Sequence, residues 1–155
     1  MTIPDDRAGD LTPLYDQLAH LLRRGKQRMD ALIEQRPAGL ALTSPQIALL
    51  SAAQLRPGME QAELAAAIAC DPATAGGMVK RLEKLGLIAR HASPRSRRGR
   101  AIYITQSGEA WIDGARAHLD AAHAAMLAPL DAEERRTLLG LLSKMLGLGN
   151  SYFRP

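Results

Sequence analysis

The clearest chemical signal in the sequence is a strip of basic residues between Lys80 and Arg100. Eight Lys or Arg side chains stand in this basic strip against a single acid, Glu83, so the strip carries a net charge of +7. The whole chain carries +4, which leaves −3 for all other residues together. A mildly acidic body with one basic strip suits a polyanion, because contacts with phosphates release condensed counterions. The alternative is a charged loop that is merely solvated.

A helix expected over residues 72–86 supplies the first candidate DNA contacts. Thr and Ala methyl groups can touch thymine methyls, while Thr and Lys polar groups can reach a base or a phosphate. The candidates are Ala73, Thr74, Ala75, Gly77, Lys80 and Arg81. Thr74 can instead be a structural residue of the first helical turn. Gly77 either permits close approach to DNA or packs against the preceding helix, and each helical glycine costs about 1 kcal/mol relative to Ala.

The arginine-rich segment ASPRSRRGR at the end of the strip supplies further candidates. A narrow A·T-rich minor groove attracts inserted arginine, and Arg97 and Arg98 are the expected insertions. Arg95 and Arg100 are expected to touch phosphates, which position a protein without specifying sequence. Arg90, in the preceding strand, is either a contact or a structural ion-pair residue.

No arrangement of residues predicts catalysis. Acids are scattered, no nucleophile lies beside a plausible base, and Gly76–Gly77 lies inside a helix rather than in a phosphate-binding loop. His118 and His123 are five apart, the wrong spacing for two metal ligands on one helical face. Cys70 is expected to be a buried apolar filler rather than a redox switch. We therefore expect no enzyme, no cofactor and no metal site.

Composition favours a small, mostly helical protein. The chain has 155 residues, and its 46% apolar content is dominated by Leu and Ala, which are strong helix formers. A single cysteine cannot form an intrachain disulfide and fits a reducing compartment. There is no signal-peptide core and no apolar run of about 18 residues. A cytoplasmic protein with no membrane partner is expected.

The elements before and within the basic strip outline a winged helix-turn-helix. Thr43 and Gln46 form a capping box that starts a helix over residues 42–54. Two short helices over residues 59–70 and 72–86 follow, joined by a tight turn. The hydrophobic period then changes, and residues 87–91 and 101–105 are expected to be strands of a hairpin with the arginines at its tip.

Longer helices are expected on both sides. Apolar residues recur at helical spacing from Leu11 to Ile33. Thr105 is expected to cap a helix that runs to about Ala128, and Asp131 starts the last helix. The fold class is therefore mainly α with a small β-hairpin wing.

The order and spacing of these residues resemble the MarR family of transcriptional regulators. The match covers roughly residues 11–148, and no single piece of it is decisive. Its residues are Leu42, Thr43, Gln46, Pro57, Gly58, Gln61, Glu63, Leu64, Ala65, Asp71, Thr74, Val79, Arg81, Leu82, Glu83, Gly86, Leu87, Ile88, Arg90, Arg97, Arg98, Ile104, Thr105 and Gly108.

The resemblance implies an obligate homodimer on a pseudo-palindromic site in double-stranded DNA. The expected organisation is a dimerisation helix in residues 1–36, a winged helix-turn-helix lobe in 40–105 and dimerisation helices in 106–150. Helix 72–86 is expected in the major groove and the wing in the flanking minor groove.

The resemblance also implies a small anionic or phenolic effector between the dimer helices and the DNA-binding lobe, such as an aromatic acid or its thioester. Such a ligand needs a cationic or hydrogen-bonding anchor and apolar walls. The candidate effector residues are Tyr15, His20, Arg23, Arg24, Met59 and Trp111. The alternative is that these residues serve the dimer interface or solvent.

One position departs from the family pattern. The family wing usually has an Asp immediately before its arginine pair, and that acid holds one arginine in place. This chain has Ser96 there, preceded by Arg95. The order of the wing without DNA is therefore open, and stronger non-specific attraction to phosphates is expected.

Together these features predict a ligand-responsive, DNA-binding transcriptional regulator that acts as a repressor. The alternative is a winged-helix module that binds another protein through its dimer helices, without sequence-specific DNA binding. The arginine-rich wing argues against that alternative.

Overall fold

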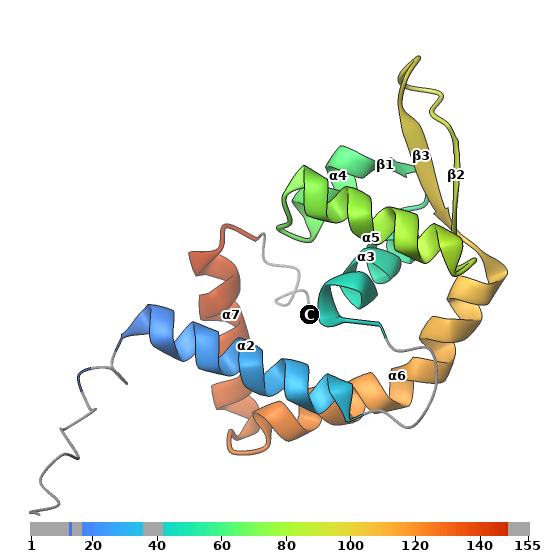
Figure 1. The fold of residues 1–155 in the computed structure, drawn as a ribbon. Helices are drawn as coiled ribbons and strands as arrows, with labels where there is room; N and C mark the ends of the chain where they lie inside the picture. The colour runs from blue at the N-terminus through green and yellow to red at the C-terminus, as the bar shows by residue number, and fades with distance from the viewer. Residues whose placement is uncertain (1–12, 14–16, 36–41, 149–155) are drawn as a thin grey trace, which may run out of the picture. The chain divides into compact units, whose positions relative to one another are not determined.

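The computed structural model describes residues 13, 17–35 and 42–148 (Figure 1). Its elements are α2 (Leu18–Glu34), α3 (Ser44–Leu55), β1 (Met59–Glu60), α4 (Gln61–Ala67), α5 (Pro72–Lys84), β2 (Ile88–Ala92), β3 (Arg100–Ile104), α6 (Gln106–Leu127) and α7 (Ala132–Met145). The mainly helical class with a small antiparallel sheet is confirmed. Within these residues, no helix combines the length and the apolar character needed to cross a membrane.

The chain folds as two compact units. The winged unit is Ile33–Leu119, and the helical unit takes in the residues up to Leu32 and those from Asp120 onward. The first half of α6 thus groups with the winged unit, further along the chain than the predicted boundary after residue 105. The burial of Ala115 and one contact agree with this grouping: Ala115 is fully buried, and the His118 Nε2 atom lies 2.9 Å from the carbonyl oxygen of Ile33.

The helix-turn-helix begins as predicted but contains a strand that the sequence did not suggest. Gln46 Oε1 accepts the Thr43 N–H at 3.1 Å at the start of α3, which confirms the capping interaction. The helix expected over residues 59–70 begins only at Gln61, because Met59 and Glu60 pair with β3. The preceding turn causes this pairing: Gly58 has a φ of +82° and its N–H donates to the Ile102 carbonyl at 2.9 Å.

Helix α5 has a well-defined beginning and end. Asp71 Oδ1 accepts the Thr74 N–H at 2.9 Å, and Pro72 occupies the first turn, where its missing N–H costs nothing. After the helix, Gly86 adopts a φ of +72°, a conformation that favours glycine. The Leu87 N–H then bonds back to the carbonyl oxygen of Leu82 at 3.0 Å.

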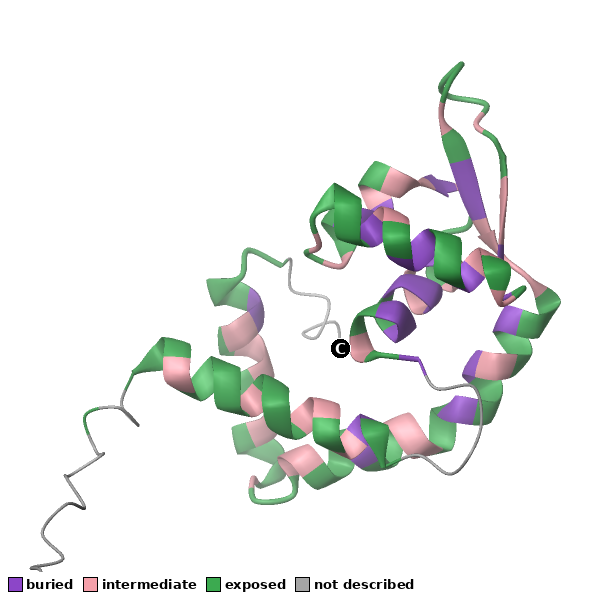
Figure 2. Ribbon diagram, in the orientation of Figure 1, coloured by how far each residue is buried: buried purple, intermediate pink, exposed green. Residues whose placement is uncertain are grey.

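The wing is a hairpin of β2 and β3 that projects beyond α4 and α5 (Figure 1). The sheet order is β1-β3-β2, and the hairpin register runs from Ile88 opposite Ile104 to Ala92 opposite Arg100. Both strands lie within one residue of their predicted positions. Buried residues of the winged unit lie on α3, α5, β3 and the first half of α6 (Figure 2). The largest fully buried ones are Leu49, Leu50, Leu64, Val79, Leu82 and Ile102.

The junction between wing and α6 is held by close backbone packing. Thr105 Oγ1 donates to the Gly86 carbonyl at 2.6 Å and accepts the Gly108 N–H at 3.1 Å. A Cβ atom at Gly108 would lie 2.2 Å from the carbonyl oxygen of Leu87. Gly108 is therefore required for the first turn of α6 to lie against the root of the wing.

The helical unit contains a further capping box, at the start of α7. Asp131 Oδ1 accepts the N–H groups of Glu133 and Glu134, and Glu134 Oε2 accepts the Asp131 N–H at 2.9 Å. The predicted start of the last helix is confirmed. Residues Leu11 and Tyr15 of the predicted first helix lie outside the described residues.

Gly108→Ala is expected to destabilise the protein by about 1–3 kcal/mol, because the added methyl overlaps backbone that cannot move aside easily. Gly114→Ala, on the same helix with open space around it, is the matched control and should stabilise by up to about 1 kcal/mol. Chemical unfolding at one protomer concentration measures both. Equal stability of the two variants would contradict the packing described above.

Candidate nucleic-acid interface

The exposed face of α5 carries most of the predicted recognition residues. Ala73, Thr74, Gly77, Lys80 and Arg81 are all exposed. They share one side of the helix, and the opposite side packs into the core of the winged unit.

The prediction that Ala75 faces DNA is wrong. Its exposed fraction is 0%, and it belongs to the buried stripe with Met78, Val79 and Leu82. The spacing explains this burial, because residues three, four and seven positions apart share a helical face.

Thr74 is partly committed to the structure of the helix start. Asp71 interacts with both its backbone N–H and its side chain, and these hydrogen bonds lower the pKa of the Asp71 carboxyl below 3.8. The Thr74 side chain is nevertheless exposed, so its methyl group remains accessible to a thymine methyl. Both of the roles considered for Thr74 are therefore compatible with its surroundings.

The two helical glycines have different surroundings. A Cβ atom on Gly76 would lie 3.0 Å from Nε2 of Gln61, so Gly76 lets α4 and α5 approach. A Cβ atom on Gly77 would meet nothing within 4 Å. Packing against the preceding helix therefore accounts for Gly76 but not for Gly77.

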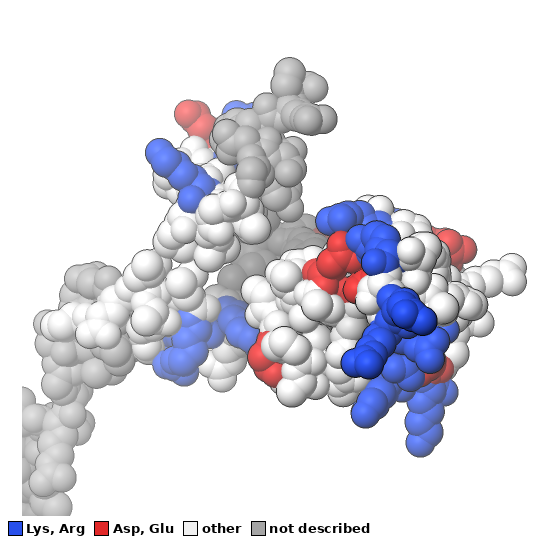
Figure 3. All heavy atoms as spheres, turned by 90° about the horizontal axis from the view of Figure 1, so that it is seen from above, with Lys and Arg blue, Asp and Glu red and all other residues white. Residues whose placement is uncertain are grey.

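The basic strip separates into paired and unpaired cations. Arg90 forms an ion pair with Glu83, which decides between the two interpretations of Arg90 in favour of a structural role. This ion pair raises the pKa of Arg90 and lowers that of Glu83, chiefly through the side-chain hydrogen bond. The remaining exposed cations form no ion pair with any described acid: Lys80, Arg81, Lys84, Arg97, Arg98 and Arg100. Seen from the wing end, Lys and Arg side chains gather over one side of the winged unit (Figure 3).

Arg95 is exposed, like the unpaired cations, but it has a protein partner. Its guanidinium donates to both carboxylate oxygens of Glu63, at 2.9 and 2.6 Å. Arg95 and Glu63 are 32 positions apart in the sequence, and no periodic pattern of the chain predicted their contact. Glu63 was visible only as a member of the motif shared with the MarR family. The expectation that Arg95 is a free phosphate contact is therefore not supported by its surroundings.

The ion pair controls the protonation of Glu63. The hydrogen bond from Arg95, followed by the backbone hydrogen bond from Glu60, lowers the pKa of Glu63 from 4.5 to about 2. A lowered carboxyl pKa stabilises the folded state fully above pH 4.5, and this contribution is lost as the pH falls through about 2. The contact therefore persists throughout the physiological pH range.

The wing tip is ordered by hydrogen bonds of its own. The Gly99 N–H donates to the carbonyl oxygen of Ser96 at 3.2 Å and to its Oγ at 3.0 Å, and the Ser93 N–H donates to the Gly99 carbonyl at 3.0 Å. The hydroxyl of Ser96 thus caps the turn at the position where the family usually has an Asp.

The predicted effector residues divide between the two units. His20, Arg23 and Arg24 lie on α2 in the helical unit, and Tyr15 is outside the described residues. His20 Nδ1 lies 3.2 Å from Arg23 Nη2. Burial, then the positive charges of the two arginines, lower the pKa of His20 below 6.5, so its imidazole is neutral at pH 7.

The two predicted apolar walls of the effector pocket belong to the winged unit. Met59 is only 4% exposed and lies on β1 rather than on a helix, so its side chain is part of the core. Trp111 is half-buried on α6. A pocket shared by all six residues remains a prediction.

Among the described residues, no group of three His, Cys, Asp or Glu side chains could hold a metal ion. Cys70 is half-buried at the turn between α4 and α5, rather than fully buried as expected.

Comparisons with known proteins place this geometry in a family. The sequence model of the MarR family matches residues 42–99, which span α3 to the wing tip. The HTH-type transcriptional repressor NicR of Pseudomonas putida is 35% identical over 147 residues, covering 94% of this chain and 93% of NicR. The chain belongs to the MarR family. It is a transcriptional regulator of the winged helix-turn-helix type.

Two solved structures extend the comparison to MarR-type regulators with ligands. BpsR of Bordetella bronchiseptica, studied for regulation of its DNA binding by 6-hydroxynicotinic acid, is 29% identical, with a TM-score of 0.77 over 84% of this chain and 98% of that one. The transcriptional repressor CouR, bound to a 23-mer DNA duplex, is 25% identical, with a TM-score of 0.80 over 88% of this chain and 97% of that one.

Gly77→Ala is expected to make the free protein more stable by up to about 1 kcal/mol, because the methyl meets open space and Ala favours the helix. The same methyl should weaken binding to operator DNA about tenfold if the backbone of α5 approaches DNA at this point. Thermal unfolding and fluorescence anisotropy measure the two effects. Gly114→Ala controls for helix stabilisation away from α5, and undiminished DNA affinity of the Gly77 variant would remove Gly77 from the interface.

Proposed function

We propose that the protein is a ligand-responsive repressor that binds a pseudo-palindromic operator as a homodimer. The observation that carries this proposal is the division of the basic strip into paired and unpaired cations. The cations of α5 and the wing tip are exposed and unpaired among the described residues, whereas Arg90 of the same strip is neutralised by its neighbour. Unpaired cations on both α5 and the wing tip are suited to bind phosphates and groove edges.

The two elements are proposed to enter neighbouring grooves. The exposed face of α5 presents Thr74, Gly77 and Lys80, whose chemistry suits base edges in the major groove. The wing tip presents Arg97 and Arg98, which suit the negative potential of a narrow minor groove. Arg81 and Arg100 are proposed to contact phosphates.

The helical unit supports the proposed homodimer. Among the described residues its exposed large apolar side chains are Leu18, Leu21, Leu22, Leu138, Leu141, Met145, Leu146 and Leu148. An apolar surface of this kind on the helices of a soluble regulator requires a partner, and a second copy of the chain satisfies it with the same surface.

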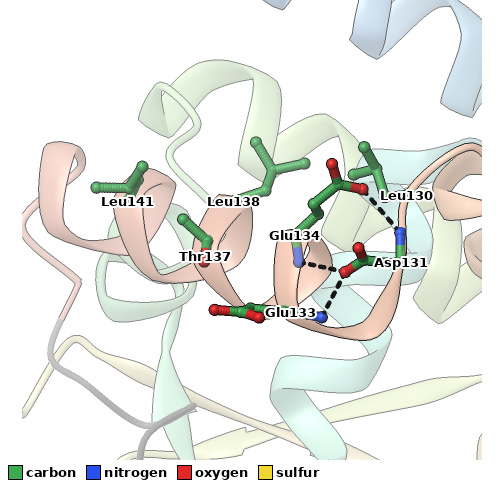
Figure 4. A pocket seen from close by; sticks show the side chains of 7 residues that line it. All are labelled: Leu130, Asp131, Glu133, Glu134, Thr137, Leu138 and Leu141. Carbon is green, nitrogen blue, oxygen red and sulfur yellow. Dashed lines mark hydrogen bonds between the residues drawn. The ribbon is translucent and has the colours of Figure 1, made fainter.

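A depression of about 480 Å³ at the start of α7 belongs to this face (Figure 4). Leu130, Leu138 and Leu141 are apolar parts of its lining, and the carboxylates that begin the helix stand beside them. The acids disfavour an anionic effector here, because like charges repel. The depression is better suited to a helix of the partner subunit.

The effector is proposed to be a small aromatic carboxylate anchored by α2. Arg23 and Arg24 are exposed cations on this helix, and neutral His20 beside them can donate or accept a hydrogen bond. BpsR, a protein of the same fold, has its DNA binding regulated by 6-hydroxynicotinic acid. This chemistry makes that compound the first ligand to test.

Operator binding is tested by titrating the purified protein with its own upstream DNA and with a scrambled duplex. We expect a preference of about a thousandfold for the upstream DNA. Arg97→Ala and Arg98→Ala should each weaken binding. Because a guanidinium in a narrow minor groove also neutralises the phosphates beside it, each should flatten the slope of log K against log salt by about 0.9 per phosphate that is no longer neutralised.

Arg116→Ala is the control for this experiment, because it removes one exposed arginine from α6 of the winged unit, where Arg116 pairs with Asp113 at 3.3 Å. Its salt slope should equal that of the unmodified protein. Equal affinity for both duplexes would reduce the basic strip to a non-specific anchor. Absence of binding to either would favour a protein partner instead.

6-Hydroxynicotinic acid is expected to release the protein from operator DNA, and its carboxamide analogue to do so at least about tenfold less well, because a charged group strengthens the contact with arginine. Replacing Arg23 and Arg24 with Ala should raise the concentration of acid needed without changing DNA affinity in its absence. Anisotropy of a labelled operator measures both effects. Equal release by acid and amide would argue against a carboxylate anchor on α2.

A further inference from the structure

The wing tip is tied to the first turn of α4 by a group of contacts that we call the wing clip, formed by Glu60, Glu63, Ser93 and Arg95. Besides its two bonds to Glu63, the Arg95 guanidinium donates to the carbonyl oxygen of Gly58 at 3.1 Å. The Ser93 hydroxyl donates to Glu60 Oε1 at 2.5 Å and accepts the Arg95 N–H at 3.1 Å. The clip therefore links the wing by side chains to α4, through Glu63, and to the residue of β1 that precedes α4, through Glu60.

The acid of the clip is itself held in place. Glu63 Oε2 accepts the Glu60 N–H at 2.7 Å, which is the reciprocal contact of a capping box. A Cβ atom on Gly99 would lie 2.7 Å from Glu60 Oε1, so the wing backbone passes directly over this acid. The Glu63 carboxylate is thus oriented by the start of α4 independently of its contact with Arg95.

The same turn of α4 also meets the recognition helix. Gly76 on α5 leaves room for the Gln61 amide, at the 3.0 Å approach described above. The first turn of α4 thus touches both elements proposed to contact DNA. Gln61 meets α5, and Glu63 meets the wing. The distance between those elements depends on this turn.

We propose that Glu63 and Arg95 are positioning residues that fix the wing relative to the recognition helix, and that Arg95 is not a phosphate contact. The proposal rests on the operator binding proposed above. An acid beside the arginine pair would hold a wing arginine in place from within the wing. Here Glu63 does so from α4. Bidentate guanidinium–carboxylate geometry is directional as well as charged, and therefore suits this task.

The two roles of Arg95 predict opposite effects of Glu63→Gln. If Glu63 merely competed with phosphate for Arg95, removing its charge would release the arginine and strengthen binding to any duplex. If Glu63 positions the wing, the same change weakens binding to the operator only. The side-chain amide introduced by this substitution still offers a carbonyl oxygen to the Glu60 N–H, so the start of α4 is preserved.

The experiment compares Glu63→Gln, Arg95→Ala and the double variant on the operator and on a scrambled duplex, over a range of salt concentrations. We expect each single variant to lose about tenfold in operator affinity, and the double variant to lose no more than either, because both act through one contact. The salt slope of Arg95→Ala should match that of the unmodified protein. A slope flattened by about 0.9, or tighter operator binding by Glu63→Gln, would overturn the proposal.

Glu109→Gln is the matched control, since it makes the same charge change on an exposed position of α6. The affinity of Glu63→Gln for the scrambled duplex should equal that of this control. Loss of affinity on both duplexes alike would mean that the substitution damages binding in general, which contradicts a positioning role.

A measurement without DNA tests the clip directly in the full-length protein. Carbon-detected NMR titration of the Glu63 carboxyl should give a pKa of about 2, moving towards 4.5 in Arg95→Ala. The wing-tip amides of Ser96 and Gly99 should become more mobile in the same variant. A normal Glu63 pKa in the unmodified protein, or unchanged wing order in the variant, would show that no such clip acts in solution.

The outcomes distinguish this proposal from the operator proposal. Specific binding by the unmodified protein with additive, salt-sensitive effects of the two substitutions would leave the operator proposal intact and refute the positioning role. Equal affinity of the unmodified protein for both duplexes would refute operator recognition, and with it any role for the clip in recognition, even if the NMR titration detects the ion pair.

Discussion

The buried stripe of α5 is the constraint on which the rest of the winged unit depends. Ala75, Val79 and Leu82 are fully buried, and Met78 is nearly so, which leaves one rotation of the helix available. In that rotation Thr74, Gly77 and Lys80 face outward. Turning the helix by one residue would expose apolar side chains and bury a lysine, and burying an unpaired charge is far more costly than the loss of a few contacts. The chemistry offered to DNA is thus set by packing on the opposite side of the helix.

Ion pairs with nearby acids determine how many arginines of the basic strip are free to bind DNA. A guanidinium beside a fixed carboxylate gives up its hydration for a bidentate contact, and its charge is then largely cancelled at a distance. This applies to Arg90 and Arg95, so the strip presents fewer free charges than its composition suggests. The expectation of unusually strong non-specific attraction, drawn from the missing acid at Ser96, is weakened accordingly. An acid has not been lost from the neighbourhood of the wing; Glu63 supplies one from α4.

Features set by local chemistry could be predicted from the sequence, and features set by distant contacts could not. The caps at Thr43 and Asp131 involve residues three positions apart, and both are present. β1 was missed because a two-residue strand is specified by its partner at Ile102 rather than by its own pattern. Ala75 is different, since its distance of three and four positions from Met78 and Val79 already indicated burial. The prediction instead considered only that its methyl group could touch a thymine methyl.

The Arg95–Glu63 contact could not have been predicted from either residue alone, because a surface arginine near other arginines is typical of phosphate binding and an acid in the first turn of a helix is typical of capping. Only the antiparallel pairing of β1 with β3, which carries the start of α4 to the side of the wing, brings the two together. The unpredicted strand therefore explains the unpredicted ion pair.

This arrangement has a consequence for regulation. If the wing and α5 are held at a set distance by α4, an effector cannot easily weaken DNA binding by separating them, because several directional contacts would break together. In the proposed homodimer, changing the separation of the two winged units costs none of these contacts. Half-sites read by such dimers lie about one helical turn apart, ~34–36 Å, so a small change in separation misaligns both recognition helices at once. Rigidity within each winged unit is what would convert a ligand-induced shift of the dimer helices into loss of DNA.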